Sequence, residues 1–354
     1  MANGEATIAV IGCGHWSTEA HLPALAGDPR ARLIAVVDPD PDARRVARER
    51  FGAEHDFASV DELLGAVRPD GAIVAAPAAL HAPLSIELLA AGAHVLVEKP
   101  MALDAASGRA MLKAAEDAGV SLSVGYPWHY NEQSLRVREE VAGGRIGKLE
   151  LVTCLFGSTL REYYRGNPEA YSSVLEYESV PRGETYADPA LAGGGQGQNQ
   201  VTHAAALLLF LTGLHPATVA AQCESFELDL DLVDAISVRF EGGTVGTLAS
   251  TGGVVPGHDN LLEYRLFGRE GHVTFDVIAG RATFHGADGA VEEISELPLQ
   301  LRYPQLEPAR NLVGTIVEGQ PSGSPAQLGL EVVAVLEAMY RSSDSGGQAI
   351  AATT

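Results

Sequence analysis

Strand and helix patterns alternate along the first third of the chain, and this alternation restricts the fold more than any other feature of the sequence. Short apolar runs rich in β-branched residues, such as ATIAVIG (6–12) and LIAVVD (33–38), have the composition of buried parallel strands. Helical segments lie between them, and one begins near Pro41 and ends at Gly52, which are the positions those residues favour. The pattern predicts βαβ units and a doubly wound parallel sheet over residues 1–126.

The sequence after this first domain has a different texture. One polar helix is expected near 131–142, followed by strand-like runs with glycine-containing breaks of hairpin length. Two later helices are expected at 308–318 and 326–341, and residues 342–354 are expected to form a frayed tail. We therefore predict an α/β protein in which residues 127–354 form an α+β domain with a large, open, mainly antiparallel sheet, one face of which is covered by helices.

The composition excludes several classes of function. The formal net charge is −22, which argues against nucleic acid and anionic membranes as partners. No apolar run approaches the roughly 20 residues that span a bilayer, and the N-terminus lacks the pattern of a signal peptide. Three scattered cysteines form neither a disulfide framework nor a metal-ligand pattern. We expect a cytoplasmic protein with no metal, no nucleic-acid partner and no membrane partner.

A glycine turn, GCGHWS, joins the first expected strand to the first helix. Its pattern is the G-x-G-x-x-G fingerprint of a dinucleotide-binding Rossmann domain, with a serine in place of the third glycine. Gly12 can make the tight turn, and Gly14 has no Cβ to block a pyrophosphate approaching the helix N-terminus, where free N–H groups favour anions. We expect Gly12 and Gly14 to bind the cofactor together with His15 and Trp16.

An acidic residue follows the turn at the distance that the fingerprint requires. Asp38 ends the second strand, and its carboxylate can accept hydrogen bonds from an adenosine ribose but would repel a 2′-phosphate. NAD is therefore favoured over NADP as the cofactor. Arg44 and Arg45 follow within two helical turns and leave NADP open, and Asp38 with Pro39 could also be only the start of a turn.

Glu98 and Lys99 come directly after the apolar strand HVLV (94–97). Ligands of open α/β sheets bind outside the carboxyl ends of the strands. A lysine in such a place is costly to hold unless it has water, a partner or a chemical role. Pro100 restricts Lys99 to an extended conformation, and about one X–Pro bond in twenty is cis. Lys99 is therefore a candidate catalytic residue, the alternative being a surface lysine at a strand end.

These segments resemble the glucose–fructose oxidoreductase, inositol dehydrogenase and rhizopine-catabolism family (Gfo/Idh/MocA). The resemblance implies a Rossmann domain and an α/β domain whose open sheet often makes the oligomer interface, hence a homodimer or homotetramer. It also implies oxidation or reduction of a secondary alcohol of a sugar or cyclitol with NAD(P). The matching segments, within residues 8–213, are AVIGCGHWSTEAHLPAL, AVVDPDPDARRVA, AAPAALHAPLSIELLAAGAHVLVEKPMA and GGGQGQNQVTH…LTG.

The resemblance also implies roles for single residues. It assigns Lys99 to the catalytic centre and Glu98 to the nicotinamide ribose. Pro77 and His81 fall where the T-P-N-x-x-H motif of the family lies beside the cofactor. The threonine and the asparagine of that motif are both alanine here, so two side-chain hydrogen bonds are missing.

A stretch of glycines and amides, GGGQGQNQVTH, comes just before an apolar helix. His203 has an ordinary pKa near 6.5, which suits it to taking a hydroxyl proton while the lysine stabilises alkoxide character. If the helix begins near residue 197, Asn199 and His203 are i,i+4 neighbours on one face. The amides, Gln196 among them, are suited to reading hydroxyl groups. We expect the glycines to let the backbone close around a substrate ring.

The family commonly has G-G-G-x-L-x-D-x-G-x-H at this place, with aspartate where this chain has Asn199. A carboxylate could stabilise protonated His203 by its charge, whereas a neutral amide cannot. Either His203 acts with Lys99 while Asn199 orients a substrate hydroxyl, or the chemistry differs from simple alcohol oxidation. A core histidine bonded to a backbone carbonyl is the remaining alternative for His203.

Aromatic residues follow the last parallel strand. Trp128, His129 and Tyr130 are expected to contact the substrate, because aromatic faces pack on the C–H faces of sugars, or else to seal the domain junction. The segment 161–189 shows no clear helix or strand, and we expect a substrate lid or an oligomer arm there. Its candidate substrate contacts are Tyr163, Tyr164 and Arg165.

The sequence thus predicts an NAD-dependent oxidoreductase that transfers a hydride from a ring secondary alcohol to nicotinamide C4. The substrate class is a sugar, glycoside, anhydrosugar or cyclitol. One alternative is a glycoside-cleaving enzyme of the same fold, in which transient ring oxidation permits elimination. A second alternative is a non-catalytic, cofactor-binding regulator.

Overall fold

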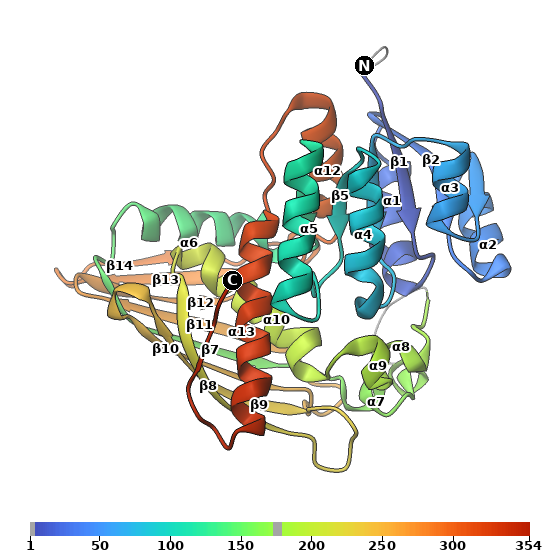
Figure 1. The fold of residues 1–354 in the computed structure, drawn as a ribbon. Coiled ribbons are helices and arrows are strands. Elements are labelled where there is room, and N and C mark those ends of the chain that lie inside the picture. Colours follow the sequence, from blue (N-terminus) through green and yellow to red (C-terminus); the bar gives the residue numbers. More distant parts are fainter. Residues whose placement is uncertain (1–3, 173–178) are drawn as a thin grey trace. The chain divides into compact units, whose positions relative to one another are not determined.

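The computed structural model describes residues 4–172 and 179–354. The chain divides into two compact units, and each is described by itself (Figure 1). One division falls between Gly125 and Tyr126, but two segments that the sequence analysis placed in the second domain belong to the first unit. The first unit comprises residues 1–125, 168–192 and 305–330, and the second comprises 126–167, 193–304 and 331–354.

A six-stranded, all-parallel sheet forms the centre of the first unit, in the order β3-β2-β1-β4-β5-β6. This is the strand order of a Rossmann domain, and the order reverses between β1 and β4. Ligands of such sheets bind at the carboxyl ends of the strands beside this reversal. The strands are β1 (Ala6–Ile11), β2 (Ala31–Val37), β3 (His55–Phe57), β4 (Gly71–Val74), β5 (His94–Val97) and β6 (Leu122–Val124).

Helices cover both faces of this sheet, which explains why its central strands are almost wholly apolar. One face packs in a single core with α1 (Leu22–Ala26), α2 (Pro41–Phe51) and α12 (Glu307–Glu318). The other face carries α3 (Val60–Ala66), α4 (His81–Ala90) and α5 (Ala105–Ala118). The sequence analysis missed β3 and α3, because β3 is only three residues long and two of them are polar.

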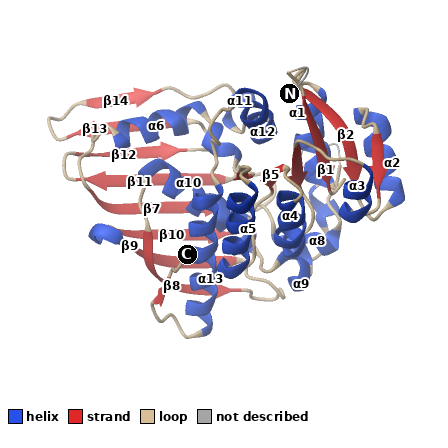
Figure 2. Cartoon of the chain, turned by 45° about the horizontal axis from the view of Figure 1, so that its top comes forward, coloured by secondary structure: helices blue, strands red, loops and turns tan. Residues whose placement is uncertain are grey.

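A nine-stranded sheet forms the second unit, in the order β14-β13-β12-β11-β7-β10-β9-β8-β15 (Figure 2). Its neighbouring strands are antiparallel except for β7 and β10, which are parallel. In β9 and β10 every second residue is buried, so one face of the sheet is covered and the other is open. The strands are β7 (Leu149–Gly157), β8 (Pro216–Glu224), β9 (Val233–Phe240), β10 (Val245–Thr251), β11 (Leu261–Gly268), β12 (Gly271–Asp276), β13 (Arg281–Gly286), β14 (Val291–Ile294) and β15 (Ile350–Ala351).

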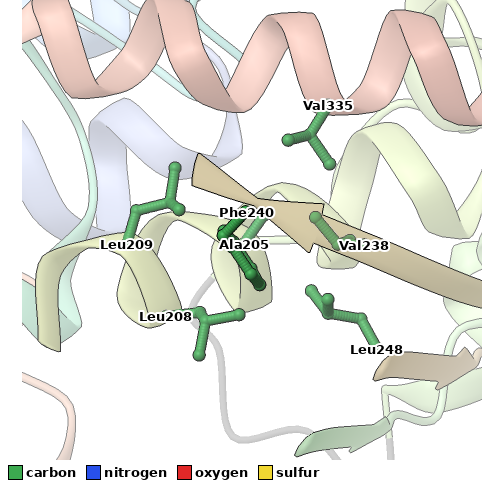
Figure 3. Close-up of a pocket in the computed structure, with 7 residues that line it drawn as sticks. All are labelled: Ala205, Leu208, Leu209, Val238, Phe240, Leu248 and Val335. Atoms are coloured by element: carbon green, nitrogen blue, oxygen red, sulfur yellow. The ribbon is translucent and has the colours of Figure 1, made fainter. Parts of the chain in front are cut away.

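The covered face packs against α6 (Glu132–Ala142), α10 (Thr202–Thr212) and most of α13 (Ala326–Asp344) (Figure 1). A small pocket remains where α10 and α13 meet the sheet, and Figure 3 shows that only apolar side chains line it. Nothing there could orient a polar ligand, so we interpret it as part of the core. Its lining residues are Ala205, Leu208, Leu209, Val238, Phe240, Leu248 and Val335.

The helices predicted near 131–142, 308–318 and 326–341 are confirmed as α6, α12 and α13. Two expectations were wrong. The C-terminal tail is not frayed throughout, because α13 continues to Asp344 and β15 pairs with β8. The segment 161–189 is not without structure either, since it contains α7 (Arg161–Tyr164), α8 (Gly183–Ala187) and the beginning of α9 (Pro189–Ala192). Elements of two to five residues are too short to show a periodic pattern.

None of the helices in the described residues is long and apolar enough to cross a membrane. Within residues 4–172 and 179–354, no group of three or more histidine, cysteine, aspartate or glutamate side chains could hold a metal ion.

Candidate active site

The glycine turn connects β1 to a π-turn, Ser17–His21, which leads into α1. Gly12 has a φ of +95°, and a Cβ there would lie 2.6 Å from the carbonyl oxygen of Ala75, so this position requires glycine. Gly14 is different, because no atom lies within 4 Å of the place where its Cβ would be. The turn is therefore open on that side, and a phosphate group could approach the backbone there.

Asp38, which follows β2, directs its carboxylate at the same turn. One oxygen accepts the Cys13 N–H at 2.8 Å and the other accepts the Asp40 N–H at 2.9 Å. A carboxylate has about four lone-pair positions, so acceptor capacity remains for the hydroxyls of a ribose. The turn and the acid together fit a dinucleotide whose adenosine ribose carries no 2′-phosphate.

Glu98 is buried after β5 and has partners on both carboxylate oxygens. One lies 2.9 Å from Nε2 of His21, and the other accepts the backbone N–H of Lys99 at 3.0 Å. Burial acts to raise the pKa of Glu98, but the hydrogen bond from His21 and the charges of His21 and Lys99 outweigh it, and the pKa lies below its ordinary value. A Cβ on Gly125 would collide with this carboxylate, so the glycine makes room for it.

Lys99 stands at the carboxyl end of the sheet, as predicted, and its peptide bond to Pro100 is cis. Burial lowers the pKa of Lys99 to about 8, against the opposing effect of the Glu98 charge. The buried ring of His81 faces the carbonyl oxygens of Pro100 and Ala76 at 2.7 and 2.8 Å. His81 thus braces the loop that carries Lys99, and Pro77 directly follows the second of these carbonyl groups.

A segment distant in the sequence lies against the glycine turn. The N–H and the hydroxyl of Ser179 both donate to the Glu19 carboxylate at 2.8 Å, and the same hydroxyl lies 2.8 Å from Nδ1 of His15. Arg182 donates to the Asp40 carboxylate at 2.6 Å. Trp16 lies beside His15, with ring centroids 6.4 Å apart. Residues 179–182 therefore belong to the surroundings of the turn, a contact that local sequence patterns do not reveal.

In the second unit, the helix carrying His203 begins at residue 197, as expected, but its first turn, Gly197–Val201, is a π-turn. A π-turn holds more residues than an α-helical turn, so Asn199 and His203 are not in regular i,i+4 register. His203 is buried, and its ring meets the edges of Tyr126 and Trp128 with centroids 5.8 and 5.3 Å away.

The glycines before this turn have a different role from the one expected. A Cβ on Gly194 or Gly197 would collide with the hydroxyl of Tyr340, and one on Gly195 would collide with the carbonyl oxygen of Asp231. The expectation that these glycines make room for a substrate ring is thus replaced by a packing requirement inside the unit. Gly193 has a φ of +74°, which glycine adopts readily.

Gln196 is fully buried, and its amide is engaged within the unit. Its oxygen accepts the Tyr164 hydroxyl at 2.9 Å, and its nitrogen donates to Ser158 and Ser250 at 3.2 and 2.8 Å. The amide therefore ties the glycine stretch to the sheet and is not presented to a substrate, which corrects the expectation for Gln196. Tyr164 is likewise held inside the unit.

The other expected substrate contacts differ in exposure. His129 stacks on Phe210 at 4.2 Å, and burial lowers its pKa to about 3, so it is a neutral ring of the core rather than a substrate contact. Trp128 and Tyr163 are also buried, while Tyr130 is half-buried. Arg165 is exposed, but its charge is balanced by the carboxylates of Glu162 and Glu227.

Sequence reasoning missed His21, Ser179, Asp231 and Tyr340, each of which contacts a residue that it did identify. The contacts of Ser179 and Tyr340 join residues 164 and 142 positions apart, and those of His21 and Asp231 join residues 77 and 36 positions apart. Only His21 had a local signal, because it is a polar residue in the otherwise apolar run AHLPAL that follows the fingerprint.

Comparison with known proteins supports this description. Residues 6–126 match the sequence profile described as an oxidoreductase family with an NAD-binding Rossmann fold. Residues 134–274 match the profile described as the GFO/IDH/MocA C-terminal domain. The first profile ends one residue past the division between Gly125 and Tyr126, and the second lies wholly after it.

Among curated relatives, inositol 2-dehydrogenase of Rhizobium meliloti (strain 1021) is 34% identical over 133 residues, which are 38% of this chain and 40% of the relative. The match thus spans about two fifths of that relative. dTDP-3,4-didehydro-2,6-dideoxy-alpha-D-glucose 3-reductase of Saccharopolyspora spinosa is 28% identical over 76% of this chain and 74% of its own length.

Solved structures show the same fold over the whole chain. GenD2 from gentamicin A biosynthesis, in complex with NAD, aligns with a TM-score of 0.80 and 25% identity over 99% of this chain and 97% of its own. Levoglucosan dehydrogenase in complex with NADH and levoglucosan aligns with a TM-score of 0.85 over 99% of this chain and 100% of its own. That second structure is 18% identical and supports the fold alone.

The two glycines of the turn should respond differently to alanine. Gly14→Ala should leave the free energy of unfolding of the apoprotein within about 1 kcal/mol of wild type, because its Cβ meets no atom, yet weaken NAD binding at least tenfold. Gly12→Ala should destabilise the apoprotein by about 1–3 kcal/mol, because of its positive φ and the contact with Ala75. Chemical denaturation and calorimetric titration with NAD measure both quantities. Gly65→Ala, on α3 with open space around it, is the control, and an equal loss of NAD affinity there would contradict the assignment.

Proposed function

Because this chain belongs to the GFO/IDH/MocA family of oxidoreductases, we propose that it is an NAD-dependent dehydrogenase of a ring secondary alcohol. The substrate class is a sugar, glycoside, anhydrosugar or cyclitol, in line with the names of its relatives. The observation that carries the proposal is Lys99, an ammonium group at the carboxyl end of the buried parallel strand β5, which pairs with β4 at the reversal of strand order. A structural lysine has little reason to occupy that position.

Bound NAD would supply the hydride acceptor at nicotinamide C4, held by the glycine turn, Asp38 and Glu98. Lys99, with a pKa of about 8, is mostly protonated at pH 7. Its ammonium group donates to the oxygen of the reacting hydroxyl and stabilises the negative charge that develops there. Glu98, fixed by His21, holds the backbone N–H of Lys99 and keeps a negative charge nearby.

His203 is the proposed base, and it takes the hydroxyl proton. Asn199 orients a neighbouring substrate hydroxyl, because an amide both donates and accepts. Trp128 and Tyr130 are proposed to pack on the C–H faces of the ring, with Tyr163 and Arg165 as further contacts. Lys99 lies in the first unit and His203 in the second, so their action on one hydroxyl is part of the proposal.

Asn199 favours one alternative reaction. The family usually has an aspartate at position 199, and Asn199 lacks the negative charge that would stabilise protonated His203. This would suit a reaction cycle in which the hydride is returned to the substrate after elimination at a glycosidic bond. Such an enzyme cleaves a glycoside and accumulates no NADH. The dehydrogenase instead produces one NADH for each keto sugar.

Lys99→Met keeps the length of the side chain and removes the charge. We expect kcat to fall at least 100-fold with little change in NAD affinity, because the lost interaction is made with the developing alkoxide. NADH absorbance and chromatography of the keto product, over a panel of inositols, glucosides and anhydrosugars, measure it. Lys113→Met, on the exposed side of α5, is the matched control. Turnover within about tenfold of wild type would refute the role of Lys99, and tight NAD binding with no turnover of the panel would favour a regulator.

The pH dependence tests the protonated form of Lys99. As the pH rises through about 8, Lys99 loses its proton, so kcat should fall on the alkaline side. Lys99→Arg keeps a positive charge at all these pH values, so this falling limb should disappear, although the absolute rate is lower. Initial rates from pH 6 to 10 measure the profile, with Lys113→Arg as control. A falling limb that is unchanged in Lys99→Arg would assign it to another group.

The open face of the nine-stranded sheet suggests a homodimer or homotetramer. Leu151, Leu155, Val245 and Leu261 are 37–43% exposed on it, and we propose that a second copy covers them. Leu155→Glu should therefore shift the mass measured by light scattering to that of a smaller species, whereas Leu301→Glu, on an exposed helix elsewhere, should not. A monomeric wild-type protein at micromolar concentration would contradict this proposal.

A further inference from the structure

Four consecutive backbone N–H groups ahead of α10 all end on two residues from elsewhere in the second unit. These groups belong to residues 195–198, which lie at the start of the helix, where N–H groups have no helical acceptor. Asp231 accepts three of them and Tyr340 accepts the fourth. The contacts are Gly195 N–H to Asp231 Oδ1 at 2.7 Å, Gln196 N–H to the Asp231 carbonyl at 2.9 Å, Gly197 N–H to Asp231 Oδ2 at 2.6 Å and Gln198 N–H to Tyr340 Oη at 3.2 Å.

The two acceptors are also bonded to each other. The Tyr340 hydroxyl donates to Asp231 Oδ1 at 2.9 Å while it accepts from Gln198. Burial, together with the charge of Asp231, raises the pKa of Tyr340 well above its ordinary value, so the hydroxyl keeps the proton that it donates. Asp231 itself is buried, and its carboxylate is stabilised by the helix N-terminus that it binds.

We propose that Asp231 is a positioning residue that, with Tyr340, fixes the π-turn Gly197–Val201 and thereby the orientation of Asn199 relative to His203. The inference rests on the proposed function, which gives Asn199 and His203 their roles. The geometry of the turn itself is independent of that function.

The local packing shows why this arrangement is specific. A Cβ on any of Gly194, Gly195 or Gly197 would collide with Asp231 or Tyr340, so the backbone approaches them as closely as glycine permits. Such an approach places two N–H groups on one carboxylate, which is a strong, charge-assisted pair of hydrogen bonds. The glycines at positions 194, 195 and 197 therefore allow the Asp231 carboxylate to bind the backbone N–H groups of both Gly195 and Gly197.

The downstream side of the turn is fixed as well. The hydroxyls of Tyr126 and Thr202 lie 2.9 Å apart, and the rings of Tyr126 and His203 form a T-shaped contact. Because these contacts hold the start of α10, the π-turn Gly197–Val201 keeps its geometry only if its N-terminal end is also held in place. If that anchor is lost, the turn can relax toward a regular α-helix, which changes the direction in which Asn199 faces relative to His203.

A second buried carboxyl group, Asp234, lies beside Asp231. Burial and the negative charge of Asp231 raise the pKa of Asp234 well above its ordinary value. The protonated form of Asp234 is therefore favoured beside the Asp231 carboxylate, which binds the backbone N–H groups of Gly195 and Gly197. The Cys223 thiol is a further neighbour of this pair, and its own pKa is raised, so it remains protonated.

The test replaces one carboxylate oxygen by an amide. In Asp231→Asn one of the two backbone N–H groups faces an NH₂ group, so the turn loses an acceptor while the side-chain volume is kept. In the apoprotein, hydrogen exchange of residues 195–201 should accelerate at least tenfold, while exchange in β9 and β10 stays as in wild type. With substrate, kcat should fall at least tenfold with NAD affinity unchanged. Asp229→Asn, exposed two residues away, should change none of these.

Tyr340→Phe removes a single hydroxyl, so it remains informative even if Asp231→Asn does not fold. It should accelerate exchange chiefly at Gln198, with a smaller loss of kcat, because both carboxylate contacts remain. Unchanged exchange in both variants, or faster exchange with kcat within twofold of wild type, would overturn the inference. If wild type turns over no sugar or cyclitol, the catalytic half fails with the proposed function, and exchange in the apoprotein still decides whether Asp231 holds the turn.

Discussion

Backbone N–H groups next to a helix start need acceptors, and a buried carboxylate provides them in both units. In the first unit Asp38 binds the N–H of Cys13, and in the second Asp231 binds those of Gly195 and Gly197. In each case the bound backbone leads into a π-turn ahead of a helix. π-turns depart from regular helical hydrogen bonding and are frequent at functional sites, and they persist where their surroundings hold them.

These anchors determine where the chemically important side chains lie within each unit. The first π-turn ends at His21, whose ring binds Glu98, and Glu98 in turn binds the N–H of Lys99. The second π-turn ends two residues before His203. In both units a loop carboxylate therefore binds backbone N–H groups that precede a π-turn, and that turn leads toward a candidate site residue.

Local patterns were sufficient for much of the fold. The ends of α2 could be predicted from Pro41 and Gly52, because the residues that start and stop a helix are adjacent to it in the sequence. The glycine turn and Lys99 could be identified because each directly follows a predicted strand. The role of the glycines near His203 could not be read in this way, because it depends on Asp231, which comes from a different loop. Gln196 was misjudged for the same reason, since a buried amide and an amide that faces a ligand look alike in a sequence. The sequence shows where a glycine lies, but it does not show the distant residue that packs against the glycine in the folded protein.

The preference for NAD can be argued further from the charges around the ribose acid. A 2′-phosphate would have to approach Asp38 and then Asp40, which repel it. The nearby cations are already engaged, because Arg44 donates to the Asp38 carbonyl at 2.6 Å and Arg182 donates to the Asp40 carboxylate at 2.6 Å. Both guanidinium groups thus already have acceptors nearby, and a ribose hydroxyl needs only the acceptor capacity that Asp38 retains. The formal net charge of −22 adds a general repulsion of any further anion, so both local and global electrostatics favour the cofactor without the 2′-phosphate.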